Sequence, residues 1–175
     1  MYYGNIKNCD IANGEGVRVT LFVSGCENRC PHCFQPETWD FCYGQPFTQE
    51  TRMEILKALE PEYIQGLTLL GGEPMELENQ QIRAELLRDV RQEFPQKDIW
   101  CYTGFTYEED LCPGGRRHGD CTDELLRMVD VLVDGEFIVD LKDTKLLWKG
   151  SKNQRVIDVQ KSLAQTDPST PVLYC

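Results

Sequence analysis

The sequence predicts an α/β fold in which parallel strands form an open, partial (β/α) barrel. Short apolar, β-branched runs alternate along the chain with segments of helical periodicity, a pattern typical of strand–helix–strand units. The clusters of cysteine, glycine and acidic residues each follow one of these apolar runs, and parallel folds place their sites at the carboxyl ends of strands. A closed eight-stranded barrel takes about 250 residues. A chain of 175 residues is therefore expected to form only part of one.

The individual elements follow from local patterns. Strands are predicted at 17–23, 66–70, 98–102 and 129–133, and a further one near 156–159. A helix fits 49–59, with Thr48 or Thr51 as its cap and Glu54 completing a capping box from Thr51. A second helix is predicted to end before Pro95, because one helical face carries Ile82, Leu86, Leu87, Val90 and Phe94.

Composition limits the class of protein. An ordinary globular composition predicts a single domain over 1–175. The formal net charge of −11 argues against nucleic acid as a partner, because nucleic-acid binding uses basic surface. No apolar run reaches the roughly 18–20 residues that cross a bilayer, and the first residues lack the apolar stretch of a signal peptide. We expect a cytoplasmic protein with no membrane partner.

Three cysteines, Cys26, Cys30 and Cys33, follow the first predicted strand. Thiolates suit iron–sulfur clusters and zinc, and clustered cysteines without a secretory signal indicate metal or redox chemistry more often than disulfides. A cluster normally takes four cysteines, so three leave one coordination position open for chemistry. The alternative is a structural zinc site completed by His32 or a distant cysteine, although the second Cys-x-x-Cys pair of a zinc ribbon is missing.

Two further candidates follow other predicted strands. Gly71, Gly72 and Glu73 come after the second strand. Paired glycines let a ligand approach the backbone closely, and the glutamate can accept hydrogen bonds from an ammonium group. Asp134 follows the fourth strand and is a candidate for binding ribose hydroxyls or an ammonium group, with an ordinary Asp-Gly turn as the alternative.

Taken together, these motifs resemble the radical S-adenosylmethionine enzymes, which share the Cys-x3-Cys-x2-Cys spacing with an aromatic residue (here Phe34) behind it and the Gly-Gly-Glu-Pro segment. The resemblance is closer still to the activating enzymes of the anaerobic, glycyl-radical class of ribonucleotide reductase. It spans nearly the whole chain in order, through the segments 10–18, 21–26, 34–39, 44–47, 102–104, 131–137, 141–143 and 150–155.

The resemblance implies a radical S-adenosylmethionine fold, a [4Fe–4S] cluster held by Cys26, Cys30 and Cys33, and S-adenosyl-L-methionine bound to its free iron. Reductive cleavage would give a 5′-deoxyadenosyl radical that takes hydrogen from a glycine of anaerobic ribonucleotide reductase. An electron donor of flavodoxin type is implied, and no side chain need act as general acid or base. The cofactor-binding residues expected on this basis, with Glu73 and the glycines at the methionyl ammonium group and the aromatic side chains near adenine, are His32, Cys33, Phe34, Gly71, Gly72, Glu73 and Asp134.

Other readings stay open. Within the same chemistry, the chain could activate another glycyl-radical enzyme or be another small radical enzyme. From a different class, it could be a non-catalytic metal-binding module. The segment 112–121 departs from the family pattern and is expected to be a surface insertion with incidental thiols, although His118 beside two cysteines invites a metal site.

The remaining thiols and one polar stretch have no clear role. We expect Cys9, Cys42 and Cys101 to be small buried residues and Cys175 to be a free thiol. Gln154 and Arg155 belong to the family-like stretch and are expected to lie in a solvated polar loop, with a position facing the site or the partner as the alternative.

Overall fold

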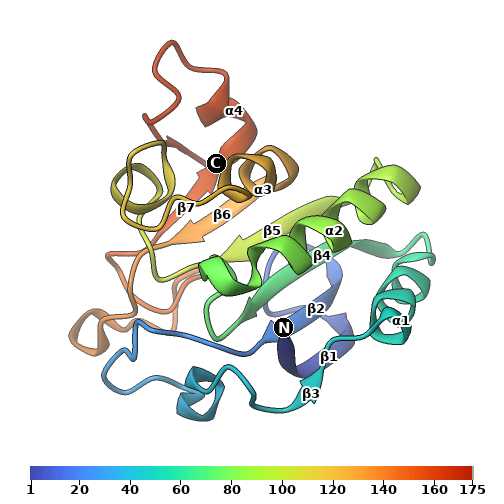
Figure 1. The fold of residues 1–175 in the computed structure, drawn as a ribbon. Helices are drawn as coiled ribbons and strands as arrows, with labels where there is room; N and C mark the ends of the chain where they lie inside the picture. The colour runs from blue at the N-terminus through green and yellow to red at the C-terminus, as the bar shows by residue number, and fades with distance from the viewer. Residues whose placement is uncertain (175) are drawn as a thin grey trace.

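The computed structural model describes residues 1–174, so the prediction for Cys175 lies outside the described residues. A single mixed sheet forms the centre of the molecule (Figure 1), with strand order β3-β1-β2-β4-β5-β6-β7-β8. Its strands are β1 (Tyr2–Asp10), β2 (Val17–Val23), β3 (Gln45–Pro46), β4 (Ile64–Gly71), β5 (Asp98–Tyr102), β6 (Val131–Asp134), β7 (Arg155–Asp158) and β8 (Val172–Leu173).

The central part of the sheet is parallel and its flanks are not. β2, β4, β5 and β6 pair in parallel, which confirms the α/β prediction for the middle of the sheet. β1 and β7 pair antiparallel with β2 and β6, so the expectation of parallel strands is wrong at both sides. The reason is in the connections: a parallel neighbour needs a long crossover, usually helical. The link from β6 to β7 holds only the short 3-10 helix η3 (Val139–Leu141), among the described residues.

The helices cover one face of this sheet (Figure 1) and build the main core against it. They are α1 (Gln49–Leu59), α2 (Leu77–Glu93), α3 (Thr122–Met128) and the short α4 (Val159–Leu163), with a 3-10 turn η1 (Pro36–Trp39) and a π-type turn η2 (Tyr107–Leu111) between strands. Thr48 caps α1 in a reciprocal box with Thr51, so the predicted box from Thr51 to Glu54 is wrong. The apolar face predicted for α2 is confirmed, with Leu86, Leu87 and Val90 buried.

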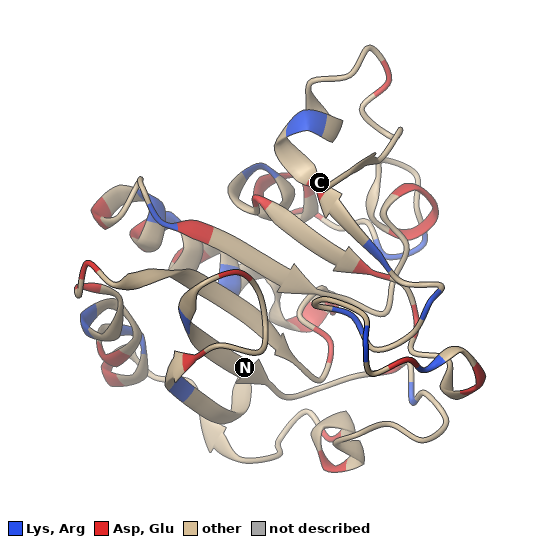
Figure 2. Ribbon diagram, turned by 180° about the vertical axis from the view of Figure 1, so that it is seen from behind, with Lys and Arg blue, Asp and Glu red and all other residues tan. Residues whose placement is uncertain are grey.

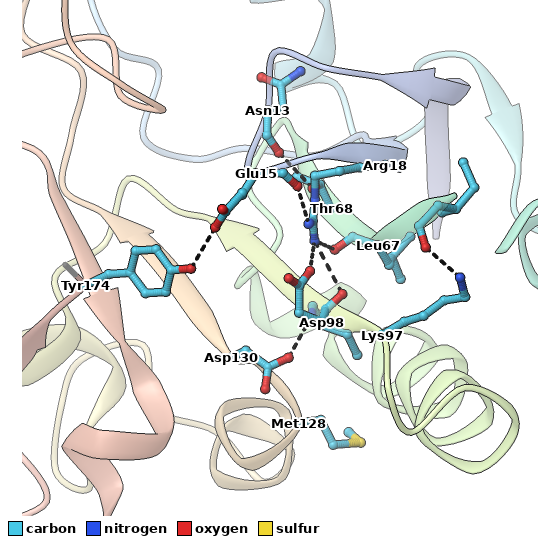
Figure 3. Close-up of polar contacts among 12 residues, drawn as sticks. Asn13, Glu15, Arg18, Leu67, Thr68, Lys97, Asp98, Met128, Asp130 and Tyr174 are labelled. Atoms are coloured by element: carbon cyan, nitrogen blue, oxygen red, sulfur yellow. Dashed lines mark hydrogen bonds and ion pairs between the residues drawn. The ribbon is translucent and has the colours of Figure 1, made fainter. Parts of the chain in front are cut away.

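The opposite face of the sheet is partly polar. Strand register aligns Thr20, Thr68, Trp100 and Val131 across β2, β4, β5 and β6, and side chains alternate between the faces of a strand. Where these strands begin, the fully buried Arg18 donates to the Thr68 hydroxyl over 2.7 Å and pairs with the Asp98 carboxylate over 2.5 Å (Figure 3). The buried ion pair joins three strands at the edge opposite to the cysteines.

Two smaller outcomes complete the fold. Cys101 is buried as expected, whereas Cys9 and Cys42 are exposed, because β1 and the turn before β3 lie at the edge of the sheet rather than under the helices. A search of the helices in residues 1–174 finds none with the length and apolarity that a membrane crossing requires.

Candidate metal and cofactor site

A cavity of about 410 Å³ opens at the carboxyl ends of β2, β4 and β5. Parallel strands bring their carboxyl ends to one edge of the sheet, so the segments that follow them share this cavity. Of the residues expected at the site, the structure places seven on its wall: Cys26, Cys30, Cys33, Phe34, Gly71, Gly72 and Glu73.

The three thiols lie on one loop that leaves β2. Cys26 is buried, while Cys30 and Cys33 are half-buried. Burial raises the pKa of the Cys26 thiol to about 12 and that of Cys30 to about 11, and the nearby Glu73 and Glu136 carboxylates add to the two shifts. Thiolates in this loop are therefore unfavourable until a cation stabilises them, and metal coordination does so.

The chemistry of these thiols and the cavity that they share fit an iron–sulfur cluster. Within residues 1–174, no three Cys, His, Asp or Glu side chains surround one point where a lone metal ion would bind. The cysteines instead lie around a shared cavity. A cubane takes its thiolates on separate corners, and soft sulfur donors are the ligands that iron–sulfur clusters use. The donor set therefore fits a cluster held at three corners.

The two glycines after β4 let protein backbones pack against each other. Gly71 has a φ of +112°, and a Cβ there would lie 2.6 Å from the Val23 carbonyl oxygen. A Cβ on Gly72 would lie 2.7 Å from the carbonyl oxygen of Gly25. The sequence suggested glycine for the approach of a ligand, but these positions already require it so that the end of β4 can pack on the start of the cysteine loop.

Glu73 is the acidic residue that lines the cavity, and only 1% of its surface is exposed. Its Oε2 accepts hydrogen bonds from the Gly104 N–H over 2.7 Å and from the Asn28 amide over 3.1 Å, and its Oε1 accepts from the Met75 N–H over 2.8 Å. Burial raises the pKa of Glu73 to about 7, although these hydrogen bonds oppose the shift. The carboxylate is thus fixed in place, at the cavity, before any ligand arrives.

Buried side chains of α2 form hydrogen bonds to the backbone around Glu73. Arg83 donates to the carbonyl oxygens of Glu73 and Glu76 over 3.1 and 2.7 Å, and Asn79 donates to the Ser24 carbonyl over 2.9 Å. Burial lowers the pKa of Arg83 to about 10, with the nearby acids acting against the shift. The polar residues at the start of α2 therefore support the site rather than face solvent.

The segment 112–121, expected to be a surface insertion, contacts the cysteine loop. Arg117 pairs with Glu27 over 2.7 Å and lies 3.7 Å from Glu76, and its guanidinium packs over the Phe105 ring at 5.0 Å. Glu76 in turn accepts a hydrogen bond from the Glu27 N–H over 2.8 Å. Sequence reasoning missed this role; the only signal was the Arg116-Arg117 pair in an acidic chain.

The segment between β6 and β7 forms another part of the cavity wall. Gln154 lines the cavity and fastens this segment, donating to the Gly135 carbonyl over 2.9 Å and accepting from the Gly150 and Ser151 N–H groups over 2.9 and 3.1 Å. Trp148 also lines the cavity, and its ring packs on Trp100 with 5.0 Å between centroids. The expectation of a solvated loop is therefore wrong for Gln154, which lies on the cavity wall.

Two expected residues do not reach the cavity. His32 is exposed, has a φ of 61° and is absent from the cavity wall. Asp134 is 1% exposed, and its carboxylate accepts from Arg155 and from the Tyr107 N–H. Its neighbour Val133 pairs with the cavity residue Tyr102, and alternation along β6 puts Asp134 on the other face. The Asp134 carboxylate thus contacts Arg155 and the Tyr107 backbone instead of lining the cavity, and its contact with a ligand stays a prediction.

Comparison with known proteins agrees with this geometry. A family model described as a 4Fe-4S single cluster domain matches residues 12–157. An anaerobic ribonucleoside-triphosphate reductase-activating protein of Enterobacteria phage T4 is 42% identical over 156 residues, which cover 89% of this chain and 93% of the relative. Proteins of the same name from Pasteurella multocida and Escherichia coli are each 40% identical, over 88% and 89% of this chain and 95% and 97% of theirs. This chain belongs to the family of anaerobic ribonucleoside-triphosphate reductase-activating proteins.

Proposed function

We propose that this protein activates anaerobic ribonucleotide reductase by reductive cleavage of S-adenosyl-L-methionine at a [4Fe–4S] cluster. The observation that carries the proposal is one cavity lined both by three thiols and by the buried Glu73 carboxylate. The names of the relatives, which are aligned over nearly their full length, support the choice of reductase. Residues 1–175 would act as one minimal radical S-adenosylmethionine domain, its sheet an open part of a barrel.

The residues divide the work. Cys26, Cys30 and Cys33, which all line the cavity, would hold the cluster. When bound, the cluster would supply the electron for reductive cleavage of S-adenosyl-L-methionine to methionine, and the other product would remove a hydrogen atom from the substrate glycine Cα. Side chains of this chain supply position and charge, and none needs to move a proton.

Glu73 would receive the methionyl ammonium group. Hydrogen bonds from Asn28, Met75 and Gly104 fix the Glu73 carboxylate at the cavity, where its negative charge would attract an ammonium group. Phe34 would lie near the adenine ring, since it lines the cavity and packs against Phe137 with 5.0 Å between ring centroids. The cavity of about 410 Å³ lies within the range of small-molecule sites, roughly 300–1,000 Å³.

The partners follow from the same proposal. The macromolecular substrate is the glycyl-radical polypeptide of the reductase, and the reductant is a donor of flavodoxin type in the cytoplasm. Nucleic acid is not expected as a partner, since the chain carries a formal net charge of −11.

The test begins with the purified protein under anaerobic conditions. Iron and sulfide are added, the product is reduced with dithionite, and S-adenosyl-L-methionine is supplied. We expect about four irons and four sulfides per chain and formation of 5′-deoxyadenosine, with both lost in Cys30→Ala. Addition of the reductase polypeptide should then produce the electron paramagnetic resonance signal of a glycyl radical.

Two results would contradict parts of the proposed function. One zinc per chain without sulfide would mean a non-catalytic metal module. Formation of 5′-deoxyadenosine without a radical on the reductase, but with one on another glycyl-radical enzyme, would keep the chemistry and change the partner.

A further inference from the structure

Exposed apolar side chains gather beside the mouth of the cavity. Phe137, Leu146, Trp148 and Lys149 line it from the segment 137–152, which we call the rim segment. The rim segment also exposes side chains away from the cavity, with Leu147 at 71%, and Phe34 next to it is exposed at 68%. Contiguous apolar surface of this kind marks interaction sites on soluble proteins. The remaining exposed apolar residues of the rim segment are Ile138, Val139 and Leu141.

The same segment carries cations in an acidic protein. It holds Lys142, Lys145, Lys149 and Lys152 against the two carboxylates Asp140 and Asp143, whereas the whole chain has a net charge of −11. Figure 2 shows several blue stretches close together in the loops beyond one end of the sheet, with some red stretches between them.

The charged and apolar parts are joined. Lys142 places its ammonium 5.1 Å from the centre of the Phe34 ring, and Phe34 packs on Phe137 of the rim segment. Lys145 is exposed and has no ion pair among residues 1–174. Protein interfaces combine an apolar centre with a polar rim, and this patch has both.

The rim segment is also held in shape. Lys142 pairs with Ser151 in a β-bridge, the Ser151 hydroxyl accepts from the Ile138 N–H over 3.2 Å, and Asn153 donates to the Glu136 carbonyl over 2.8 Å. Because these contacts already fix the conformation of the rim segment, a partner that binds it loses little conformational entropy.

We infer that the rim segment together with Phe34 is the surface on which the substrate polypeptide docks, through an acidic stretch that meets the lysines. The inference rests on the proposed function, because a glycine Cα must then enter the cavity past its mouth. The polypeptide that carries this glycine covers whatever borders the mouth. On one side that border is the rim segment, whose cations complement carboxylates and whose apolar side chains are already exposed.

The experiment measures binding of the purified anaerobic ribonucleotide reductase polypeptide from the same organism. Two variants change the rim segment outside the cavity wall, Lys145→Glu and Leu147→Ser. Two matched variants change exposed residues of α1, Lys57→Glu and Met53→Ser. Dissociation constants are measured at about 50 and 300 mM salt, since salt screens exposed charges.

We expect each rim variant to weaken binding about tenfold at low salt. The effect of Lys145→Glu should shrink at high salt, whereas that of Leu147→Ser should persist, and the α1 variants should match the wild type. Formation of 5′-deoxyadenosine with dithionite and no partner should be equal in all five proteins, because none of the four changed residues lies on the cavity wall.

The outcomes separate the two proposals. Dissociation constants within twofold of wild type for both rim variants would overturn the docking surface while leaving the proposed function intact. The same holds if the rim variants slow only the reduction of the cluster by a flavodoxin, which would give the surface to the electron donor. Absence of 5′-deoxyadenosine from the wild type would instead remove the proposed function.

Discussion

Two parts of the cavity wall differ in how many hydrogen bonds the protein makes to them. One is the Glu73 wall, residues 71–73 at the end of β4, and the other is the cysteine loop, residues 26–35 after β2. On the Glu73 wall, the peptide N–H, the carbonyl and both carboxylate oxygens of Glu73 all have hydrogen-bond partners in the protein. On the cysteine loop, Cys33 provides the single backbone N–H between residues 27 and 35 that donates to a backbone carbonyl of the described chain, over 3.1 Å to Cys30. Arg29 and His32 also have left-handed backbone, with φ of 47° and 61°.

This difference indicates which part of the site the polypeptide can order by itself and which part needs a bound ligand to become ordered. Left-handed backbone at residues other than glycine is costly and persists where surrounding contacts or ligands hold it. Metal binding couples to local folding in the same way. If the proposed function holds, the Glu73 wall is a preformed receptor, and the order of the cysteine loop is expected to depend on the cluster.

Hydrogen exchange gives the largest expected effect. The amides of Cys30, His32, Phe34 and Gln35 should exchange fast in the protein without a cluster and at least about 100-fold more slowly after anaerobic loading. The Gly72 and Glu73 amides, bonded to Val23 and Gly25, should be protected in both states. Cys30→Ala should remove the gain in the loop and leave the wall unchanged; equal exchange of the loop in both states would contradict the comparison.

The pH dependence of stability tests the burial of Glu73 separately from the cysteine loop. Burial raises the pKa of Glu73 from 4.5 to about 7, so the folded state holds this proton more tightly than the unfolded state. The resulting stabilisation is complete below pH 4.5 and is lost as the pH rises through 7. In the metal-free protein, up to about 3 kcal/mol of unfolding free energy should disappear over this window.

Urea unfolding from pH 4 to 8 measures the effect. Glu73→Gln should lack this part of the profile, while Glu78→Gln, an exposed position in the first turn of α2, should follow the wild type. Parallel profiles for Glu73→Gln and wild type would show that Glu73 does not titrate in this range.

Gly72→Ala tests whether the two walls share a boundary. The added methyl group would meet the Gly25 and Thr38 carbonyl oxygens at 2.7 and 2.9 Å, and backbone cannot move away as a side chain can. We expect a loss of about 2 kcal/mol in unfolding free energy together with weaker binding of S-adenosyl-L-methionine. Gly4→Ala is the control, since its Cβ would meet only the ring of Tyr43, at 3.0 Å.

Arg117→Met gives the smallest expected effect, because its side chain and that of Glu27 are 26% and 54% exposed. A partly exposed ion pair contributes at most about 1 kcal/mol, so a chelator should remove iron from the loaded variant about fivefold faster than from wild type. Arg116→Met is a matched control, since Arg116 pairs with Asp110 instead of the cysteine loop. Equal rates for both variants would show that segment 112–121 does not hold the loop.

Much of the fold could be predicted because its central strands are buried on both faces. β2 has one half-buried residue followed by six buried ones, and such strands read as apolar, β-branched runs. β1 was missed because its residues are mostly polar and exposed, with a burial pattern close to that of a loop. The antiparallel flanks also escaped prediction, since local patterns do not give strand direction.

For the site, residues adjacent to strand ends could be predicted and those joined across long separations could not. The three cysteines, Phe34 and the Gly-Gly-Glu segment lie on the cavity wall as expected. Arg117 meets Glu27 across 90 residues, a contact that no local spacing encodes. Asp134 likewise contacts Arg155 and Tyr107, which lie 21 and 27 residues away in the chain, and local spacing does not encode these contacts.

The position of Gly25 bears on how the cluster is assembled. Its N–H donates to the Thr38 carbonyl over 2.8 Å, its own carbonyl accepts from Glu73 over 2.8 Å, and the next N–H, of Cys26, donates to Trp39 over 3.3 Å. The first thiol of the loop is therefore stationary, while the other two lie on backbone that can adapt. A carrier delivering iron and sulfide would meet Cys26 as a fixed point of attachment, and the chain would then wrap Cys30 and Cys33 around the incoming inorganic core.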